Sequence, residues 1–310
     1  MLKSVKIILF LISTLTLFAC NKVEEGQYQV DATDEMAQQV GDSMVSVDEF
    51  GGTTTGTISQ LNSTGYEKSF ARLSRGQNVL TKIFNQNISD LFIAKSYAAT
   101  ACNVVPFQCN GAGASSRTFS ECTLPGGGAL SGSVNLTYTG SGTGTCTIPA
   151  NGDRVVRAPN YEVRGLRGAI FKVSPLTTGQ SLTRASASTF NLNSTGIRRT
   201  FTTGEGKVVL DMSSLTTSAL TINGSTRGVR SLSNSGGVMI IDNLTSGSCS
   251  MTPFNVQWTS GCNCPTSGNW SGSCTDGLAL TVAFGGATCG ETTITKGSAV
   301  KILTMDRCQP

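Results

Sequence analysis

Two cysteines separated by a single residue, Cys262 and Cys264, form the local motif most capable of chemistry in this sequence. Two thiolates at that spacing could ligate a soft metal or act as a redox pair. A zinc site usually has two such pairs, with two to four residues between the cysteines of each. The sequence has no second pair of that spacing. We therefore predict structural disulfides at Cys262 and Cys264, and no metal site.

The chain contains no histidine. Serine and cysteine triads that use imidazole as the base, histidine-ligated zinc hydrolases and imidazole proton shuttles are therefore excluded. Carboxylate pairs remain, and a glycosidase needs two carboxyl groups about 5–10 Å apart. No local motif brings two of them together, so we predict no catalytic residue and no cofactor. A histidine-free hydrolase of cell-wall glycan is the alternative hypothesis.

Residues 154–230 carry a net charge of +8, from eleven basic and three acidic side chains. The planar guanidinium of arginine matches phosphate and carboxylate groups, so a basic sheet face could bind anionic glycan or lipopolysaccharide. One alternative is a solvated face whose cations keep strand edges from pairing, and another is a face covered by the acidic N-terminal segment. The candidate anion-binding residues are Arg154, Arg157, Arg164, Arg167, Arg198, Arg199, Arg227 and Arg230.

Cys20 ends a leader with a positive end at Lys3 and Lys6, an apolar run over residues 7–18, and the small residue Ala19. The run is shorter than the ~20 apolar residues that a membrane-spanning helix needs. Its ending resembles the lipobox of bacterial lipoprotein precursors, which are cut before the cysteine and acylated on it. The resemblance implies lipidation of Cys20 and a lasting anchor of two or three acyl chains. An ordinary secretory signal is the alternative.

Asn21 follows Cys20, at the position where lipoproteins of the resembled family that stay in the inner membrane commonly carry aspartate. The resemblance therefore implies an outer-membrane location, with the domain facing the periplasm or the cell surface. Ten cysteines remain, and an even number in an exported chain points to disulfides because that compartment oxidises thiols. They are Cys102, Cys109, Cys122, Cys146, Cys249, Cys262, Cys264, Cys274, Cys289 and Cys308.

Three N-terminal segments precede the expected domain, the first being the lipoprotein signal peptide over residues 1–19. Residues 20–57 carry a net charge of −7 and few large apolar side chains, which predicts an acidic flexible tether. Residues 58–101 repeat apolar side chains every three or four positions from Leu80 to Phe92, which predicts a helix or helical hairpin packed on the domain. A membrane-surface helix is the alternative, but few basic residues flank the apolar face.

Residues 102–310 form the predicted disulfide-bearing β domain. Val134, Leu136 and Tyr138 alternate with polar residues, as do apolar residues over 278–284, which places each set on one face of a strand. Turn clusters such as 193–196 recur about every ten residues. We therefore predict a mainly β fold, an antiparallel meander that forms a sandwich or a strongly curved sheet. With only 6% aromatic residues, the sequence does not favour an outer-membrane barrel.

A weak internal repeat relates residues 117–148 to 262–294, since both contain a cysteine, Ser-Gly-Ser, Leu-Thr and a second cysteine in that order. Two copies of a strand-hairpin unit would explain it, and chance similarity in a chain rich in glycine, serine and threonine is the alternative. The repeat predicts two disulfides, Cys122–Cys146 and Cys264–Cys289, and leaves Cys102–Cys109 as a local bridge. It does not assign Cys249, Cys262, Cys274 and Cys308.

The same region resembles uncharacterised lipoproteins of Gram-negative bacteria, notably predatory ones. The resemblance lies in residues 117–122, 132–138, 264–268, Leu280, 289–291 and Cys308, and it covers the chain from about residue 100 onward. It implies an envelope location and a β-rich fold without an activity. We therefore expect a lipid-anchored envelope protein with a binding or structural role. Its expected partners are the membrane, through Cys20, and an anionic glycan or lipopolysaccharide, and we do not expect nucleic acid.

Overall fold

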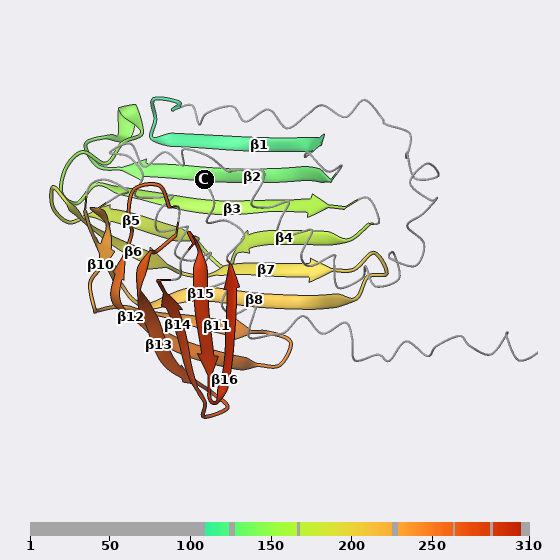
Figure 1. The fold of residues 1–310 in the computed structure, drawn as a ribbon. Helices are drawn as coiled ribbons and strands as arrows, with labels where there is room; N and C mark the ends of the chain where they lie inside the picture. The colour runs from blue at the N-terminus through green and yellow to red at the C-terminus, as the bar shows by residue number, and fades with distance from the viewer. Residues whose placement is uncertain are drawn as a thin grey trace, which may run out of the picture.

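The computed structural model describes residues 109–123, 128–165, 168–224, 229–262, 264–285 and 288–304. Within these residues the fold is mainly β, with one short 3-10 helix, and every strand belongs to one antiparallel sheet (Figure 1). The predicted signal peptide, tether and helical segment lie outside the described residues. The elements are β1 (Ala114–Thr123), β2 (Ala129–Thr139), η3 (Thr143–Thr145), β3 (Arg154–Arg164), β4 (Ile170–Pro175), β5 (Gln180–Arg184), β6 (Thr189–Ser194), β7 (Ile197–Thr202), β8 (Val208–Ser218), β9 (Leu220–Asn223), β10 (Ser231–Leu232), β11 (Gly237–Asp242), β12 (Gly247–Gln257), β13 (Ser267–Cys274), β14 (Ala279–Phe284), β15 (Glu291–Lys296) and β16 (Ala299–Thr304).

Eight of the sixteen strands join end to end as four long, interrupted passes across the sheet. Along one edge of β3, Tyr161–Arg164 pair with β4 and Arg154–Arg157 pair with β5, so β4 and β5 lie in line. Three further passes are built in the same way. Each consists of two strands that lie in line because they pair with the two strands of the pass before it, and these passes are β6 with β7, β8 with β9, and β10 with β11. Counting each pair once, the sheet has twelve passes, and each pairs with the next along the chain.

The interruptions in neighbouring passes lie side by side, and together they form a line across the sheet that we call the crease. The interruption between β4 and β5 is bonded to the one between β6 and β7. The amide of Leu176 donates to the carbonyl oxygen of Gly196 at 2.9 Å, and that of Thr195 donates to Gly179 at 2.9 Å. The crease comprises Leu176–Gly179, Thr195–Gly196, Ala219, Ser233–Gly236 and Asn255.

The crease continues into the later passes through the close approach of two backbones at Gly236 and Ala219 and through a hydrogen bond between Asn234 and Asn255. A Cβ atom on Gly236 would lie 2.3 Å from the carbonyl oxygen of Ala219, so only glycine fits there. The side chain of Asn234 accepts a 2.7 Å hydrogen bond from the amide of Asn255, where β12 has a bulge. Bulges and glycine kinks bend strands and increase sheet twist. A line of them therefore lets this long sheet curve.

One hydrophobic core receives side chains from strands throughout the sheet. The predicted alternation in β2 is confirmed, because Val134, Leu136 and Tyr138 are at most 2% exposed. In β14 the prediction is correct from Leu280 to Phe284, but Leu278 is 45% exposed because it lies in the turn before that strand. Figure 1 shows β12 to β16 at a steep angle to β1 to β4, which is the direction change expected of a strongly twisted sheet.

Gly236→Ala should reduce the free energy of unfolding more than Gly277→Ala does. Both glycines have left-handed φ angles, +87° and +80°, so alanine strains the backbone at either site by about 1–2 kcal/mol. Only at Gly236 would the new Cβ also meet the backbone of Ala219, and displacing packed atoms costs a further ~1–3 kcal/mol. Urea unfolding of both variants measures the difference. Equal losses would contradict tight packing across the crease.

Candidate functional site

All eight cysteines in the described residues are disulfide-bonded, which confirms the predicted oxidised state for these positions. Cys249 and Cys274 lie directly opposite each other in β12 and β13, with Cα atoms 3.9 Å apart. Cys262 bonds to Cys289, and this bridge ties the loop before β13 to the loop before β15. Cys264 is disulfide-bonded too. Both sulfurs of the 262–264 motif are therefore covalently used and offer no thiolate to a metal.

The first pairing predicted from the internal repeat is wrong. Cys146 bonds to Cys109, with Cα atoms 5.6 Å apart, and not to Cys122. Cys122 lies opposite Leu130 near the start of β2, whereas Cys146 follows the end of that strand. An extended strand of this length separates the two cysteines by about 30 Å, far more than a disulfide can span. The local Cys102–Cys109 bridge is also wrong, because Cys109 is taken; Cys102, Cys308 and Cys20 lie outside the described residues.

The second predicted pairing is also wrong, because Cys289 bonds to the other cysteine of the motif, Cys262, and not to Cys264. The two repeat segments also follow different paths. Residues 131–136 lie within the single strand β2, whereas the matching residues 271–280 run through β13, a turn and the start of β14. Pairings therefore cannot be transferred from one segment to the other.

The predicted anion-binding arginines divide between the two faces of the sheet. Arg198 and Arg199 are neighbours in β7, and successive strand residues point to opposite faces. The Arg198 side chain is 46% exposed, while Arg199 is buried and donates to the hydroxyl of Ser214 at 3.3 Å. The buried candidates are Arg157, Arg199 and Arg230. The exposed candidates are Arg154, Arg164 and Arg198. Arg167 and Arg227 lie outside the described residues.

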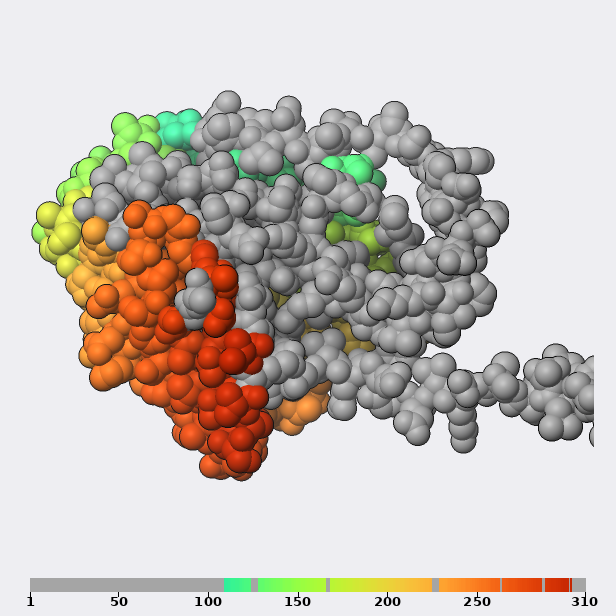
Figure 2. Space-filling view, viewed as in Figure 1, coloured from blue at the N-terminus to red at the C-terminus, as the bar shows by residue number. Residues whose placement is uncertain are grey.

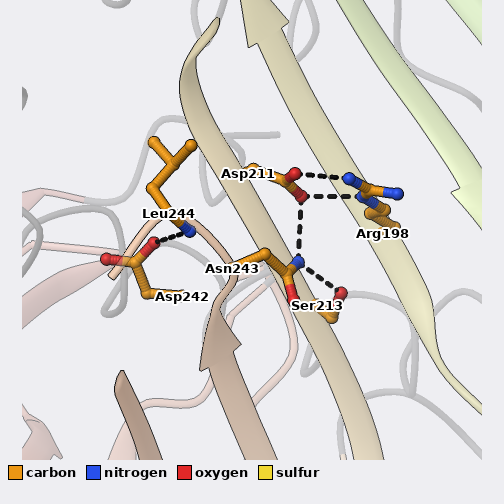
Figure 3. A network of polar contacts seen from close by, with 6 residues as sticks. All are labelled: Arg198, Asp211, Ser213, Asp242, Asn243 and Leu244. Carbon is orange, nitrogen blue, oxygen red and sulfur yellow. Dashed lines mark hydrogen bonds and ion pairs between the residues drawn. The ribbon is translucent and has the colours of Figure 1, made fainter. Parts of the chain in front are cut away.

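Arg198 is engaged in a polar network with β8 and with the residue after β11 (Figure 3). Its Nε donates to Oδ1 of Asp211 at 2.7 Å, and its Nη2 donates to Oδ2. Nδ2 of Asn243 donates to the same Oδ1 and to the Ser213 hydroxyl, each at 2.9 Å. The hydrogen bond from Arg198, aided by Asn243, outweighs burial and lowers the pKa of Asp211. An external anion would have to compete with this bidentate carboxylate.

A second exposed arginine also has a carboxylate partner, because Nη2 of Arg164 lies 3.5 Å from Oε1 of Glu162. Arg184, which belongs to the same basic stretch, donates to three backbone carbonyls, and its guanidinium lies 5.6 Å from the centre of the Phe190 ring. The net charge of the basic stretch therefore overstates the positive field on the outer face, since several cations are neutralised or hold loops in place.

Asp242 and Asp153 are each bonded to neighbours of their own. Asp242 accepts hydrogen bonds from the Leu244 amide at 3.0 Å and the Thr245 hydroxyl at 2.7 Å, and it points away from Asp211 (Figure 3). Asp153 is buried and accepts two backbone hydrogen bonds and one hydroxyl hydrogen bond from its own loop. These carboxylates act as turn and network acceptors, which is a different arrangement from the facing acid and base of a glycosidase.

The outward side of β12 to β15 carries two aligned rows of uncharged side chains, most of them polar, that the sequence analysis missed. Strand register places their members directly opposite one another on neighbouring strands, and all of these side chains are exposed or half-buried. Figure 2 shows the strands from β12 onward, orange to red, over a broad part of one surface of the molecule. We call these rows the hydroxyl platform, composed of Thr252, Ser271, Thr281 and Thr295 in one row and Phe254, Asn269, Ala283 and Thr293 in the other.

Phe254 ends one row, faces outward by the regular alternation of β12, and directly precedes the bulge of that strand. Phe254 is 53% exposed. The next residue, Asn255, has a φ of +50° and is clasped by Asn234, which also donates to its side-chain oxygen at 3.3 Å. Opposite the bulge, a Cβ on Gly268 would lie 2.2 Å from the carbonyl oxygen of Asn255. The sequence signal for the platform was the alternation of hydroxyl and apolar residues, as in 293–295.

The inner side of the same strands fixes the platform from beneath. Trp270 and Val282, whose neighbours Ser271 and Thr281 face outward, are fully buried, and Ile294 is buried as well. The Cys249–Cys274 disulfide joins β12 to β13 covalently. The platform is therefore a rigid surface, because its backbone is fixed by sheet hydrogen bonds, a packed core and a covalent bridge.

No family model, curated protein or solved structure matches the chain. Among the described residues, no helix has the length and apolar character needed to cross a membrane.

Disulfide mapping of the unreduced protein should recover Cys109–Cys146, Cys249–Cys274 and Cys262–Cys289. Thiol labelling without reductant should give no signal at Cys262 or Cys264. The double change Cys249→Ser with Cys274→Ser should lower the free energy of unfolding by about 2–5 kcal/mol, because the unfolded chain is then less constrained. Labelling of the 262–264 pair, or stoichiometric zinc or iron on isolation, would contradict this prediction.

Asp211→Asn should destabilise the fold at neutral pH and flatten its response to acid. Arg198 holds the folded pKa of Asp211 below the unfolded value of about 3.9. The carboxylate therefore stabilises the fold fully above that value, and its contribution is lost as pH falls through the folded pKa. We expect a loss of about 1.5–3 kcal/mol at pH 7 and convergence with the parent protein in acid.

Urea unfolding of the Asp211→Asn variant from pH 2 to pH 7 tests this expectation. Glu205→Gln, at an exposed position in the turn between β7 and β8, is the matched carboxyl-to-amide control and should unfold like the parent at pH 7. Parallel curves for Asp211→Asn and the parent at every pH would show that the network does not contribute through charge.

Proposed function

We propose that this protein is an outer-membrane lipoprotein, anchored by acyl chains on Cys20, whose β domain has a binding or structural role at the cell envelope. The leader ending at Cys20 supports the anchor. The disulfides support an exported, oxidising compartment, because bonds such as Cys249–Cys274 and Cys262–Cys289 persist where thiols are oxidised. An acidic segment of net charge −7 then separates the lipid from the domain.

The observation that carries the binding role is the hydroxyl platform. Polar side chains at regular spacing on a rigid, exposed sheet can meet an extended ligand at many points without ordering a loop, so little conformational entropy is lost on binding. Ligands at the envelope include polymers long enough to use such a surface. The platform therefore favours a polymer-binding role over a purely structural one.

Anionic envelope polymers remain a candidate ligand class through the exposed arginines. Arg198 and Arg164 are already paired with Asp211 and Glu162, and exposed ion pairs are screened by salt. We therefore propose that any contribution from these arginines is small and disappears at high salt, while the main binding does not depend on charge.

Mature protein isolated from membranes should begin at Cys20 and carry acyl chains, whereas Cys20→Ala should accumulate as an unlipidated precursor. Mass spectrometry of the N-terminal peptide and fractionation of the envelope measure the two effects. Asn21→Ala, which changes the adjacent residue and keeps the cysteine, is the matched control and should stay lipidated. A mature, unmodified N-terminus at any other residue would contradict the proposed anchor.

A further inference from the structure

We propose that the hydroxyl platform binds a neutral polysaccharide, with Phe254 stacking on a sugar ring. This inference rests on the proposed binding role, and it specifies the surface and the class of ligand. Its basis is the combination of two mostly polar rows in register, an outward aromatic ring at the end of one row, and the absence of charge at every row position.

The rows have the geometry of a chain of sugar rings. Thr252, Ser271, Thr281 and Thr295 succeed one another across adjacent strands at intervals of about 4.8 Å, and the second row runs parallel at about 6.7 Å, two residues along each strand. A hydroxyl can both donate and accept a hydrogen bond, and the Asn269 amide adds two donors and an acceptor. Thr252 already donates to the carbonyl oxygen of Ser271 at 3.3 Å, so its hydroxyl is available as an acceptor. A sugar hydroxyl has the same dual capacity, so successive rings can bond to successive strands.

Phe254 provides the aromatic part of the site, and the exposed Val300 and Ile302 of β16 continue the rows at their other end. Sugar rings present C–H groups on their faces, and an exposed aromatic ring offers them apolar area and a negative π face. The bulge at Asn255, the Asn234 clasp and the close approach of Gly268 fix the backbone that carries this ring. Directly opposite Phe254 lies Asn269, so a sugar stacked on the ring has an amide within reach.

The charges of β15 that flank the platform favour a neutral ligand. After Thr295, Lys296 lies 2.7 Å from Asp276 and is neutralised by it. Before Thr293, Glu291 begins the strand and accepts from the Thr288 hydroxyl. The row positions between them are all uncharged. A polyanion would gain no ion pair on the platform and would meet a carboxylate at its edge.

Affinity electrophoresis of the full mature chain in detergent micelles tests the inference. Native gels would contain dextran, laminarin or hydroxyethyl cellulose as neutral probes, and polygalacturonate or lipopolysaccharide as anionic probes, each at low and high salt. Two variants remove the proposed contacts, namely Phe254→Ala, and Thr281→Val combined with Thr295→Val, which keeps side-chain shape and strand preference. The matched controls are Leu244→Ala, an exposed apolar residue in the β11–β12 turn, and Thr137→Val on the outward side of β2.

At least one neutral probe should retard the parent protein equally at both salt concentrations. Both platform variants should weaken that retardation about threefold or more, whereas both controls should match the parent. Undiminished retardation of the platform variants would overturn the platform as the site while leaving a glycan-binding function in place. Retardation by anionic probes alone, lost at high salt, would assign binding to the arginines. Absence of retardation in every gel would overturn the binding role itself, independently of the lipid anchor.

Discussion

The structure depends on one constraint, which is that the apolar face of a single antiparallel sheet must be buried. The core draws on nearly every strand of that one sheet, so the apolar face extends across the whole sheet, through its change of direction. A regular pleated sheet resists such bending. Here the bend is placed where neighbouring passes are interrupted together, and the backbone bonds between Thr195 and Gly179 and between Leu176 and Gly196 keep the halves of the sheet joined through it. The bulge of β12 lies on the same line.

Strand faces could be predicted from the sequence because alternation is a local property. Val134, Leu136 and Tyr138 are buried as expected. The crease could not be predicted, because it depends on which interruptions become neighbours. The cluster 193–196, for example, has the composition of a reversing turn, yet it lies between β6 and β7 within one continuing pass. The disulfides escaped prediction for a related reason. A strand between two cysteines separates them by its own length, and one-residue spacing in the 262–264 motif does not decide which sulfur faces Cys289.

The surface charge of residues 154–230 could not be predicted from their order along the chain either. The basic stretch gives a large net charge when summed along the chain, but Arg198 and Arg199 lie on opposite faces because they are consecutive in a strand. Asp211 lies on the neighbouring strand, within reach of Arg198 only because β7 and β8 pair in that register. A charge total therefore predicts a field only after alternation and pairing are known. Once they are, two of the exposed arginines in this region, Arg164 and Arg198, prove to be paired with carboxylates.

The hydroxyl platform is linked physically to the crease, since Asn255 belongs to both the bend in β12 and the support of Phe254. The hydrogen bonds between Asn234 and Asn255 and the close approach of Gly268 fix the backbone of this bulge, directly after Phe254. The low charge content of the chain, 14%, fits the same arrangement, because uncharged rows can exchange water for sugar hydroxyls without desolvating an ion. Asn255 thus lies both on the line of interruptions in the sheet and directly after the exposed Phe254.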